Sequence, residues 1–571
     1  MTAMTPDLDK NTGDAARRRG RRRSGYLLMG ATLLAAVGIF AGAVRRQPDI
    51  TPPRFPAAQV VAADFQEAVQ SVDRQFTQWA RTEGVEMAPR ADNLTILRRI
   101  SLALIGTGLS LEEIRAVEMV PADEQVQWWT EYLLQDRRWA DYFSERLSRA
   151  FVGTNQGPFL LFRRRKFNQW LAEQLEAGRP YDDIVRQMIA ADGLWTDTPP
   201  VNFITATMDE DQKNRADPVR LAARTARTFL GQRIDCLQCH DDFLGTMELG
   251  EADAPESGTQ QHFHQLAAFF AGTGLPDPVF RGIRDDGRTY RYKYLGEESE
   301  EEVTPQVPFY RELLPTDGKP RQRLAAWVTH SQNRAFARAT VNRIWALLCS
   351  RPLVEPVDNI PLHGPVPPIL DTLADDFQAH GYDLRRLIRL IVHSQAFQRD
   401  SRADFEITET HEACWAVFPV TQLRPEQVAG CLSQIARVTA IDHRSSILTR
   451  LQSYGELQDF LKRYGDRGED EFDSDAITIP QRLLLMNGKL TRERTKNDLV
   501  GNTATRIARL VGDDGQAVQL AFLTVLNRYP SPREEQVFVA HLGGKHGNGR
   551  VRAMSDMFWA LINSTEFSWN H

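Results

Sequence analysis

Apolar residues recur at three- and four-residue steps along most of the chain between about residues 58 and 233, a pattern that predicts amphipathic helices. The runs 69–80 and 94–104 are the clearest examples. The tetrapeptide Ser110-Leu111-Glu112-Glu113 has the form of a capping box and predicts the start of another helix. A further helix is expected over 218–230, leading directly into Gly231.

The pattern changes between residues 275 and 310. Tyr290, Tyr292 and Tyr294 alternate with basic residues, as in a short strand, and an acidic cluster follows at 297–302. Helical periodicity returns over about 321–397 and again from about 424 to the end, whereas the acidic stretch 468–473 is expected to be a loop. We therefore expect a mainly α fold with two large helical domains, 58–275 and 314–571, joined by a short β-containing or flexible insert at 276–313.

The first 57 residues predict a membrane anchor. Six arginines between 17 and 23 precede an uncharged run, 26–44, and Arg45-Arg46 follow it. As a helix, 19 residues span roughly 28 Å, close to the thickness of a bilayer core. The arginine excess predicts a basic cytoplasmic N-terminus (1–25), a single transmembrane signal-anchor (26–44), a proline-rich linker (45–57) and the bulk of the chain in the periplasm. A cleaved signal peptide is the alternative, since Ala41-Gly42-Ala43 offers small residues for cleavage.

Charge and cysteine content narrow the classes of function. The chain has 571 residues and a formal net charge of −6. Because residues 1–46 carry +6, the remainder carries −12. An acidic body argues against nucleic-acid binding, which leaves a basic footprint. Five cysteines are too few for a disulfide scaffold.

The run Cys236-Leu237-Gln238-Cys239-His240 carries the strongest chemical signal. C-x-x-C-H is the attachment signature of c-type haem, in which two thiols add to the porphyrin vinyl groups and the imidazole becomes the proximal iron ligand. The expected cofactor is therefore haem c, held by Cys236, Cys239 and His240. Candidates for a sixth iron ligand nearby are Met247, His262 and His264, the two histidines lying on an apparent helix.

The same residues allow other interpretations. Cys236 and Cys239, with two of the three histidines at 240, 262 and 264, have the chemistry of a tetrahedral zinc site. A redox dithiol, a structural disulfide and two buried thiols are further alternatives.

The other motifs give weaker evidence for a catalytic or ligand-binding site. On the expected helix 336–345, Arg338 and Asn342 are one turn apart, and Glu355 or Asp358 could pair with Arg338 or Arg343 as a structural network. The sequence contains no G-x-S-x-G, H-E-x-x-H or P-loop motif, which weakens the commonest hydrolase, metalloprotease and NTPase interpretations.

Several segments together resemble a known family. The motifs at 91–102, 180–183, 229–233 and 236–240 resemble the planctomycete cytochrome-associated domain of unknown function 1549. The motifs at 336–345, 353–358 and 381–384, together with the endings 526–532 and 559–564, resemble its companion, domain of unknown function 1553. The resemblance covers roughly 60–570 and implies an exported, largely helical protein. In the family that the chain resembles, the C-x-x-C-H motif usually continues as C-H-x-H-P-F-D. Here Asp242 stands in place of the second histidine of that pattern.

Two hypotheses of function follow. The first is a membrane-anchored, c-type cytochrome-like protein that exchanges electrons with a redox partner protein. The second is a haem-free envelope protein whose cysteine and histidine cluster binds zinc or is structural, and which serves as a scaffold or as an accessory in polysaccharide breakdown.

Overall fold

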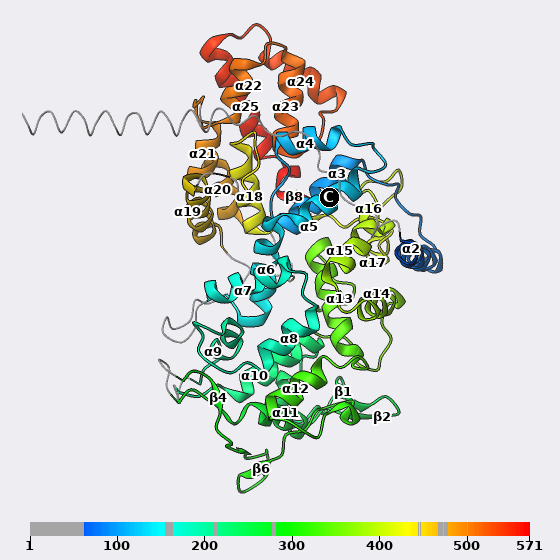
Figure 1. The fold of residues 1–571 in the computed structure, drawn as a ribbon. Helices are drawn as coiled ribbons and strands as arrows, with labels where there is room; N and C mark the ends of the chain where they lie inside the picture. The colour runs from blue at the N-terminus through cyan, green and yellow to red at the C-terminus, as the bar shows by residue number, and fades with distance from the viewer. Residues whose placement is uncertain are drawn as a thin grey trace, which may run out of the picture. The chain divides into compact units, whose positions relative to one another are not determined.

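Helices dominate the computed structural model (Figure 1), which describes residues 62–154, 164–209, 214–276, 281–442, 445, 447–465, 472, 478–499 and 501–571. The basic N-terminus, the expected membrane span 26–44 and the linker to residue 57 lie outside these residues, as does most of the acidic stretch 468–473. Among the described helices, none combines the length and the apolar character needed to cross a bilayer. The described residues all belong to one compact unit.

The first half of the described chain contains the helices that the apolar periodicity predicts. They are α2 (Ala63–Glu83), α3 (Asn93–Ile105), α4 (Leu111–Glu118), α5 (Gln125–Gln135), α6 (Arg137–Val152), α7 (Arg164–Glu176), α8 (Tyr181–Ile189), α9 (Asn202–Thr205), α10 (Pro218–Thr225) and α11 (Gln260–Ala267). Short helical turns accompany them at η2 (Pro199–Val201), η3 (Ala226–Leu230), η4 (Asp235–Gln238) and η5 (Ala268–Phe270). The expected helix 218–230 is thus α10 continued by the π-helical turn η3.

The second half is also helical. It contains η6 (Arg311–Leu313), α12 (Pro320–Val328), α13 (Arg334–Cys349), α14 (Pro368–Ala379), α15 (Leu384–His393), α16 (Gln395–Gln398), α17 (Glu409–Ala413), α18 (Pro425–Ile435) and α19 (Ile447–Tyr464). The C-terminal elements are α20 (Ile479–Asn487), α21 (Lys489–Thr495), α22 (Thr503–Leu510), α23 (Asp514–Leu526), α24 (Pro532–Leu542), α25 (Gly547–Ile562) and η7 (Glu566–Ser568).

Side-chain caps explain where several helices begin. The Asp92 carboxylate accepts a hydrogen bond from the Thr95 amide at 3.0 Å and starts α3. The predicted capping box at α4 is confirmed, with Ser110 and Glu113 satisfying each other's backbone amides. Asp217 caps α10, whose first residue is Pro218. The cap at Asp217 fixes the start of α10, which continues through η3 to the C-x-x-C-H motif.

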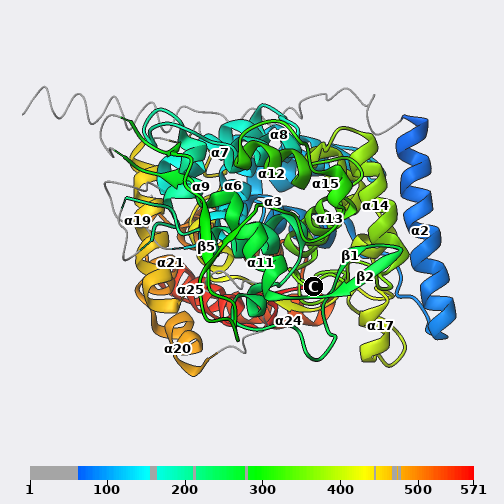
Figure 2. The same ribbon diagram turned by 90° about the horizontal axis from the view of Figure 1, so that it is seen from below.

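Within the described residues the strands form four two-stranded antiparallel pairs. They are β1 (Glu248–Glu251) with β2 (Ala254–Ser257), β3 (Thr273–Gly274) with β4 (Arg284–Asp285), β5 (Tyr290–Tyr292) with β6 (Glu301–Val303), and β7 (Thr421–Gln422) with β8 (Trp569–Asn570). The strand expected from the alternating tyrosines is β5, and the acidic residues Glu301 and Glu302 belong to its partner. Figure 2 shows β5 beside α11, where the Tyr290 and His264 rings stack.

The largest hydrophobic core contains buried residues from α2 through α15 and continues to Leu523. Within it, Tyr181 of α8 stacks on Phe336 of α13 with ring centroids 5.8 Å apart, and α2 lies beside α14 in both views (Figures 1 and 2). A second core joins α18 with the C-terminal helices and includes Leu102 of α3. The first core therefore includes residues from both predicted helical ranges, 58–275 and 314–571.

Candidate functional site

The C-x-x-C-H motif follows a sharp turn at the end of η3. Gly231 has a left-handed φ of 61°, and a Cβ there would lie 3.0 Å from Cδ1 of Ile360 and 3.3 Å from Cβ of Ala339. The Gly231 carbonyl accepts a hydrogen bond from the Ile360 amide at 2.8 Å. Only glycine suits this close approach and this backbone conformation, so the turn fixes the direction in which the chain enters η4.

The η4 turn buries one residue of the motif and exposes the two cysteines. Leu237 is buried in the large core, whereas Cys236 and Cys239 are exposed free thiols. The other three cysteines of the chain, at 349, 414 and 431, are buried and also free. The motif is therefore anchored by an apolar side chain and presents both of its sulfur atoms to solvent.

Three donors converge on the carbonyl oxygen of Gln238, between the two cysteines. The Tyr292 hydroxyl donates to it at 2.9 Å, His264 Nε2 lies 3.1 Å from it, and the Gln260 side-chain amide lies 3.5 Å from it. The rings of His264 and Tyr292 stack with their centroids 3.4 Å apart. Strand β5 and helix α11 together hold the C-x-x-C backbone in place.

The contacts of His264 define its tautomer. Because a carbonyl oxygen only accepts, Nε2 carries the proton that is donated to Gln238, and Nδ1 accepts from the Tyr290 hydroxyl at 2.9 Å. Burial lowers the pKa of His264, and the hydrogen bond to Gln238 opposes this effect only in part. His264 is thus a neutral positioning residue for the motif.

His240 has the opposite character. Its side chain is exposed, and its Nδ1 lies 2.8 Å from the carbonyl oxygen of Asp241. Within the described part of the chain, its Nε2 atom has no hydrogen-bond partner. Donation from Nδ1 to a backbone carbonyl is the arrangement that fixes a metal-ligating imidazole and leaves Nε2 to bind.

Asp242, the second residue after His240, stabilises the following loop. Its carboxylate accepts hydrogen bonds from the Met247 amide at 2.6 Å, the Leu244 amide at 3.2 Å and the Thr246 hydroxyl at 3.3 Å. Burial acts to raise the pKa of Asp242, but these hydrogen bonds lower it overall. The loop exposes two large apolar side chains, Phe243 (81 % exposed) and Leu244 (86 %).

The remaining predicted ligands have other contacts. His262 closes the capping box of α11 with Thr259, and its Nε2 lies 3.1 Å from the Glu256 carboxylate and 3.1 Å from the Arg311 guanidinium. Met247 packs against the large core, and its backbone carbonyl accepts from the Gly258 amide at 2.9 Å. No group of three or more His, Cys, Asp or Glu side chains placed to hold a metal ion occurs in the described residues.

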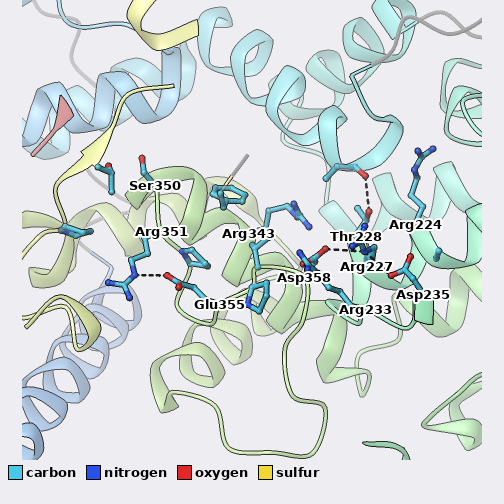
Figure 3. Close-up of a pocket in the computed structure, with 18 of the residues that line it drawn as sticks. Arg224, Arg227, Thr228, Arg233, Asp235, Arg343, Ser350, Arg351, Glu355 and Asp358 are labelled. Atoms are coloured by element: carbon cyan, nitrogen blue, oxygen red, sulfur yellow. Dashed lines mark hydrogen bonds and ion pairs between the residues drawn. The ribbon is translucent and has the colours of Figure 1, made fainter. Parts of the chain in front are cut away.

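A large cavity adjoins the motif through Asp235, the residue before Cys236 (Figure 3). Its volume is about 1170 Å³. Its charged lining comprises six arginines and five acidic residues, namely Arg220, Arg224, Arg227, Arg233, Arg343, Arg351, Asp235, Glu355, Asp358, Glu409 and Glu412. Sequence reasoning missed this cavity because its residues come from separate parts of the chain, although the arginines spaced along 220–233 were visible in the sequence.

Ion pairs across the cavity correct the expected pairing on α13. Asp358 pairs with Arg233 at 2.6 Å and with Arg227 at 3.5 Å, rather than with Arg338 or Arg343. Glu355 pairs with Arg351 at 2.7 Å. The physical reason is that Arg338 lies on the side of α13 that faces α14.

There Arg338 binds both carboxylate oxygens of Asp371, at 2.7 and 3.0 Å. Asn342 is a structural residue, as expected, and its side-chain amide donates to the Val354 carbonyl at 2.8 Å. Helix α13 is thus fixed to its neighbours through residues other than Arg343.

Two known protein families match the chain in the ranges that contain the C-x-x-C-H motif and most of the cavity lining. The family described as a protein of unknown function (DUF1549) matches residues 71–274, which include the motif, and the family described as a protein of unknown function (DUF1553) matches residues 320–446. The cavity is lined by residues from both ranges. No curated protein and no solved structure matches the chain. The chain therefore carries a match to DUF1549 followed in tandem by a match to DUF1553, as the sequence motifs predict.

Proposed function

We propose that Cys236 and Cys239 attach haem c covalently, that His240 is the proximal iron ligand, and that the chain is a redox protein. The strongest support is that the two thiols and the imidazole Nε2 of the motif are all free to react or bind. Two exposed free thiols stand beside an imidazole whose Nδ1 is bound to a backbone carbonyl and whose Nε2 is open. Such a histidine is already oriented for a metal before any metal binds.

The surroundings of the motif fit this cofactor. Phe243 and Leu244, which follow His240 closely in the sequence, are exposed and would offer apolar surface to a bound haem. The Gln238 carbonyl, held by His264 and Tyr292, keeps the backbone between the two thiols in one conformation. Haem bound here would supply one-electron transfer.

The proposal assigns no sixth ligand from this chain. Both ring nitrogens of His262 and of His264 contact protein groups, and Met247 packs against the core. Liberating either imidazole would break buried hydrogen bonds, which costs about 1–3 kcal/mol for each unsatisfied group. These contacts leave Cys236, Cys239 and His240 as the residues of this chain that would hold the haem.

We also propose that the N-terminal run 26–44 anchors the chain in the cytoplasmic membrane and places both helical domains in the periplasm. Six arginines before this run, against two after it, support that orientation. The periplasm is the compartment in which exposed thiols of a C-x-x-C-H motif meet haem. A redox partner protein would then contact the exposed surface around Cys236 and Cys239.

The test is expression of the full chain in a host with c-type haem maturation. Haem that stays on the polypeptide in a denaturing gel, together with a c-type pyridine haemochrome spectrum, is the expected result. The double variant Cys236→Ser/Cys239→Ser should carry no covalent haem. Cys349→Ser is the matched control, since Cys349 is a buried free thiol far along the chain, and it should retain haem.

Absence of haem from the wild-type chain, when a control cytochrome matures in the same cells, would contradict the proposal. Metal analysis of the same sample then tests the alternative, a haem-free envelope protein with a zinc or structural site at Cys236 and Cys239. That alternative retains the role of a scaffold or an accessory in polysaccharide breakdown.

A further inference from the structure

Arg343 brings a buried positive charge to the cavity wall. It lies on α13, is only 8 % exposed and lines the cavity. Among the described residues its guanidinium makes no hydrogen bond and no ion pair, and its Nε atom is buried without a partner. A buried charge normally has a partner, because removing it from water is costly.

The Asp358 carboxylate does not neutralise the charge of Arg343. Asp358 is the carboxylate whose charge acts on Arg343, but it already holds Arg233 at 2.6 Å and Arg227 at 3.5 Å. Burial lowers the pKa of Arg343, and the opposing effects of Tyr181 and Asp358 do not offset it. Arg343 remains ionised at neutral pH, since an arginine guanidinium keeps its proton in proteins.

The aspartates on the side of the cavity toward which Arg343 extends already have partners. Figure 3 shows Arg343 extending toward the side where Arg224, Arg227, Arg233, Asp235 and Asp358 lie, the arginine end of the cavity. Arg227 pairs with Asp235 at 3.1 Å, and Asp358 holds Arg233 and Arg227. Arg343 is therefore left without a carboxylate partner among the described residues.

The other end of the cavity carries acidic side chains and apolar lining. Arg351 and Glu355 lie there, away from Arg224 and Asp235 (Figure 3), and they pair at 2.7 Å. Glu412, which also lines the cavity, lies 3.9 Å from Arg351, so an anionic group is favoured at the arginine end instead. Apolar lining is supplied by Pro356, Val357, Ala413, Pro419 and Val420. With a volume of about 1170 Å³, the cavity is slightly larger than the range of about 300–1,000 Å³ usual for small-molecule sites.

We propose that this cavity binds an anionic organic molecule, a phosphate monoester or a dicarboxylate, and that Arg343 is its principal charge partner. The planar guanidinium offers paired N–H donors that match the oxygens of a phosphate or a carboxylate. The bound anion supplies the partner that the buried guanidinium lacks. The site joins the two matched ranges and is independent of whether haem is attached to Cys236 and Cys239.

Titration calorimetry on the full chain tests the proposal with inorganic phosphate and with succinate, against sodium chloride at matched ionic strength. Saturable binding of at least one dianion is expected, and the probe that binds identifies the ligand as phosphate or dicarboxylate. Arg343→Met should weaken this binding at least tenfold. Arg552→Gln is the control, because Arg552 is an exposed arginine on α25, and it should bind as the wild type does.

Thermal unfolding supplies a readout that a merely structural arginine would not give. Without added anion, Arg343→Met should unfold at the same temperature as the wild type or higher, since it removes an unpaired buried charge. Arg343→Lys keeps the positive charge but lacks the paired N–H donors of the guanidinium. It should therefore bind the anion more weakly than the wild type and more tightly than the Met variant. Absence of saturable binding of either probe, or binding unchanged in Arg343→Met, would overturn the proposal.

Discussion

His264 Nε2 lies 3.1 Å from the carbonyl oxygen of Gln238, the residue directly before the second cysteine of the C-x-x-C-H motif. A histidine that looked like a candidate ligand therefore acts through the backbone of the motif. It places the two thiols and has no ring nitrogen left over for a metal.

Replacing His264 should loosen the motif. In His264→Phe the ring can still stack on Tyr292, but the Gln238 carbonyl loses a donor and the Tyr290 hydroxyl loses its acceptor. We expect a loss of about 2 kcal/mol in the free energy of unfolding, together with faster alkylation of Cys236 and Cys239. Urea unfolding and thiol labelling measure the two effects.

Tyrosine substitutions on the same face separate the hydrogen bond from the ring contacts. Tyr292→Phe removes only the hydroxyl that donates to Gln238 at 2.9 Å, so the loss should be about 1 kcal/mol. Tyr294→Phe, whose ring contacts His264 at 5.9 Å between centroids, should change neither stability nor labelling. Equal labelling rates in wild type and His264→Phe would contradict a positioning role.

Stability should fall as the pH decreases below about 6.5. Burial lowers the pKa of His264 from its ordinary value of 6.5, so the folded chain keeps this imidazole neutral where the unfolded chain protonates it. The unfolded state therefore binds more protons between these two pKa values, and each pH unit of decrease costs up to about 1.4 kcal/mol for this group. Above pH 7 the contribution is constant.

Urea unfolding at pH 8, 7, 6 and 5 measures this dependence. His262, His393 and His571 also have pKa values lowered by burial and contribute in the same direction. The informative quantity is thus the difference between the wild type and His264→Phe, which should shrink as the pH falls from 7 to 5. A difference that stays constant over this range would show that His264 is not held neutral.

Leu237 should be the main anchor of the η4 turn. Its side chain is 1 % exposed in the large core, so Leu237→Ala is expected to cost about 2–5 kcal/mol of unfolding free energy. Leu244→Ala, at a leucine that is 86 % exposed, should change stability by no more than about 0.5 kcal/mol. Chemical denaturation of both variants decides whether the buried leucine holds the motif, and equal effects would contradict it.

Local patterns in the sequence were sufficient to predict the helices around the site. The apolar steps of α2 and α3, the capping box at Ser110 and the strand at Tyr290 depend on neighbouring residues, and the structure confirms them. Local sequence patterns could not predict which group accepts the hydrogen bond from His264. Gln238 and His264 are 26 residues apart, and the fold of the intervening chain brings them together.

The same limit applies to charge pairing on α13. Arg338 was expected to pair with the following loop, whereas its partner Asp371 comes from α14. Sequence spacing within one helix says which residues share a face, but which neighbour covers that face depends on tertiary packing. The unpaired state of Arg343 also needed the structure, because it depends on Asp358 being held by Arg227 and Arg233.

Gly231 should tolerate no side chain. Gly231→Ala places a Cβ 3.0 Å from Cδ1 of Ile360 at a φ of 61°, so steric and conformational penalties add to about 2–4 kcal/mol. Gly84 is the matched control, with a φ of 68° and no atom within 4 Å of the added Cβ. Gly84→Ala should show the conformational penalty alone, about 1–2 kcal/mol. Equal melting temperatures of the two variants would show that the close approach to Ile360 is unimportant.

Asp358→Asn should move stability and anion binding in opposite directions. The substitution removes the carboxylate that holds Arg233 at 2.6 Å and Arg227 at 3.5 Å, and both arginine side chains are about one-third exposed. The loss in unfolding free energy should therefore be about 1–2 kcal/mol, below the value for a fully buried pair. The substitution also removes one negative charge from the arginine end of the cavity.

The loss of this negative charge should tighten binding of inorganic phosphate severalfold in titration calorimetry, provided that the variant is measured below its unfolding transition. Glu355→Gln is the matched control, since it removes a carboxylate at the opposite end of the same cavity, where Arg351 is its partner. Its effect on phosphate affinity should be smaller because the charge lies farther from Arg343. Weaker phosphate binding by Asp358→Asn than by the wild type would contradict the assignment of the anion to the arginine end.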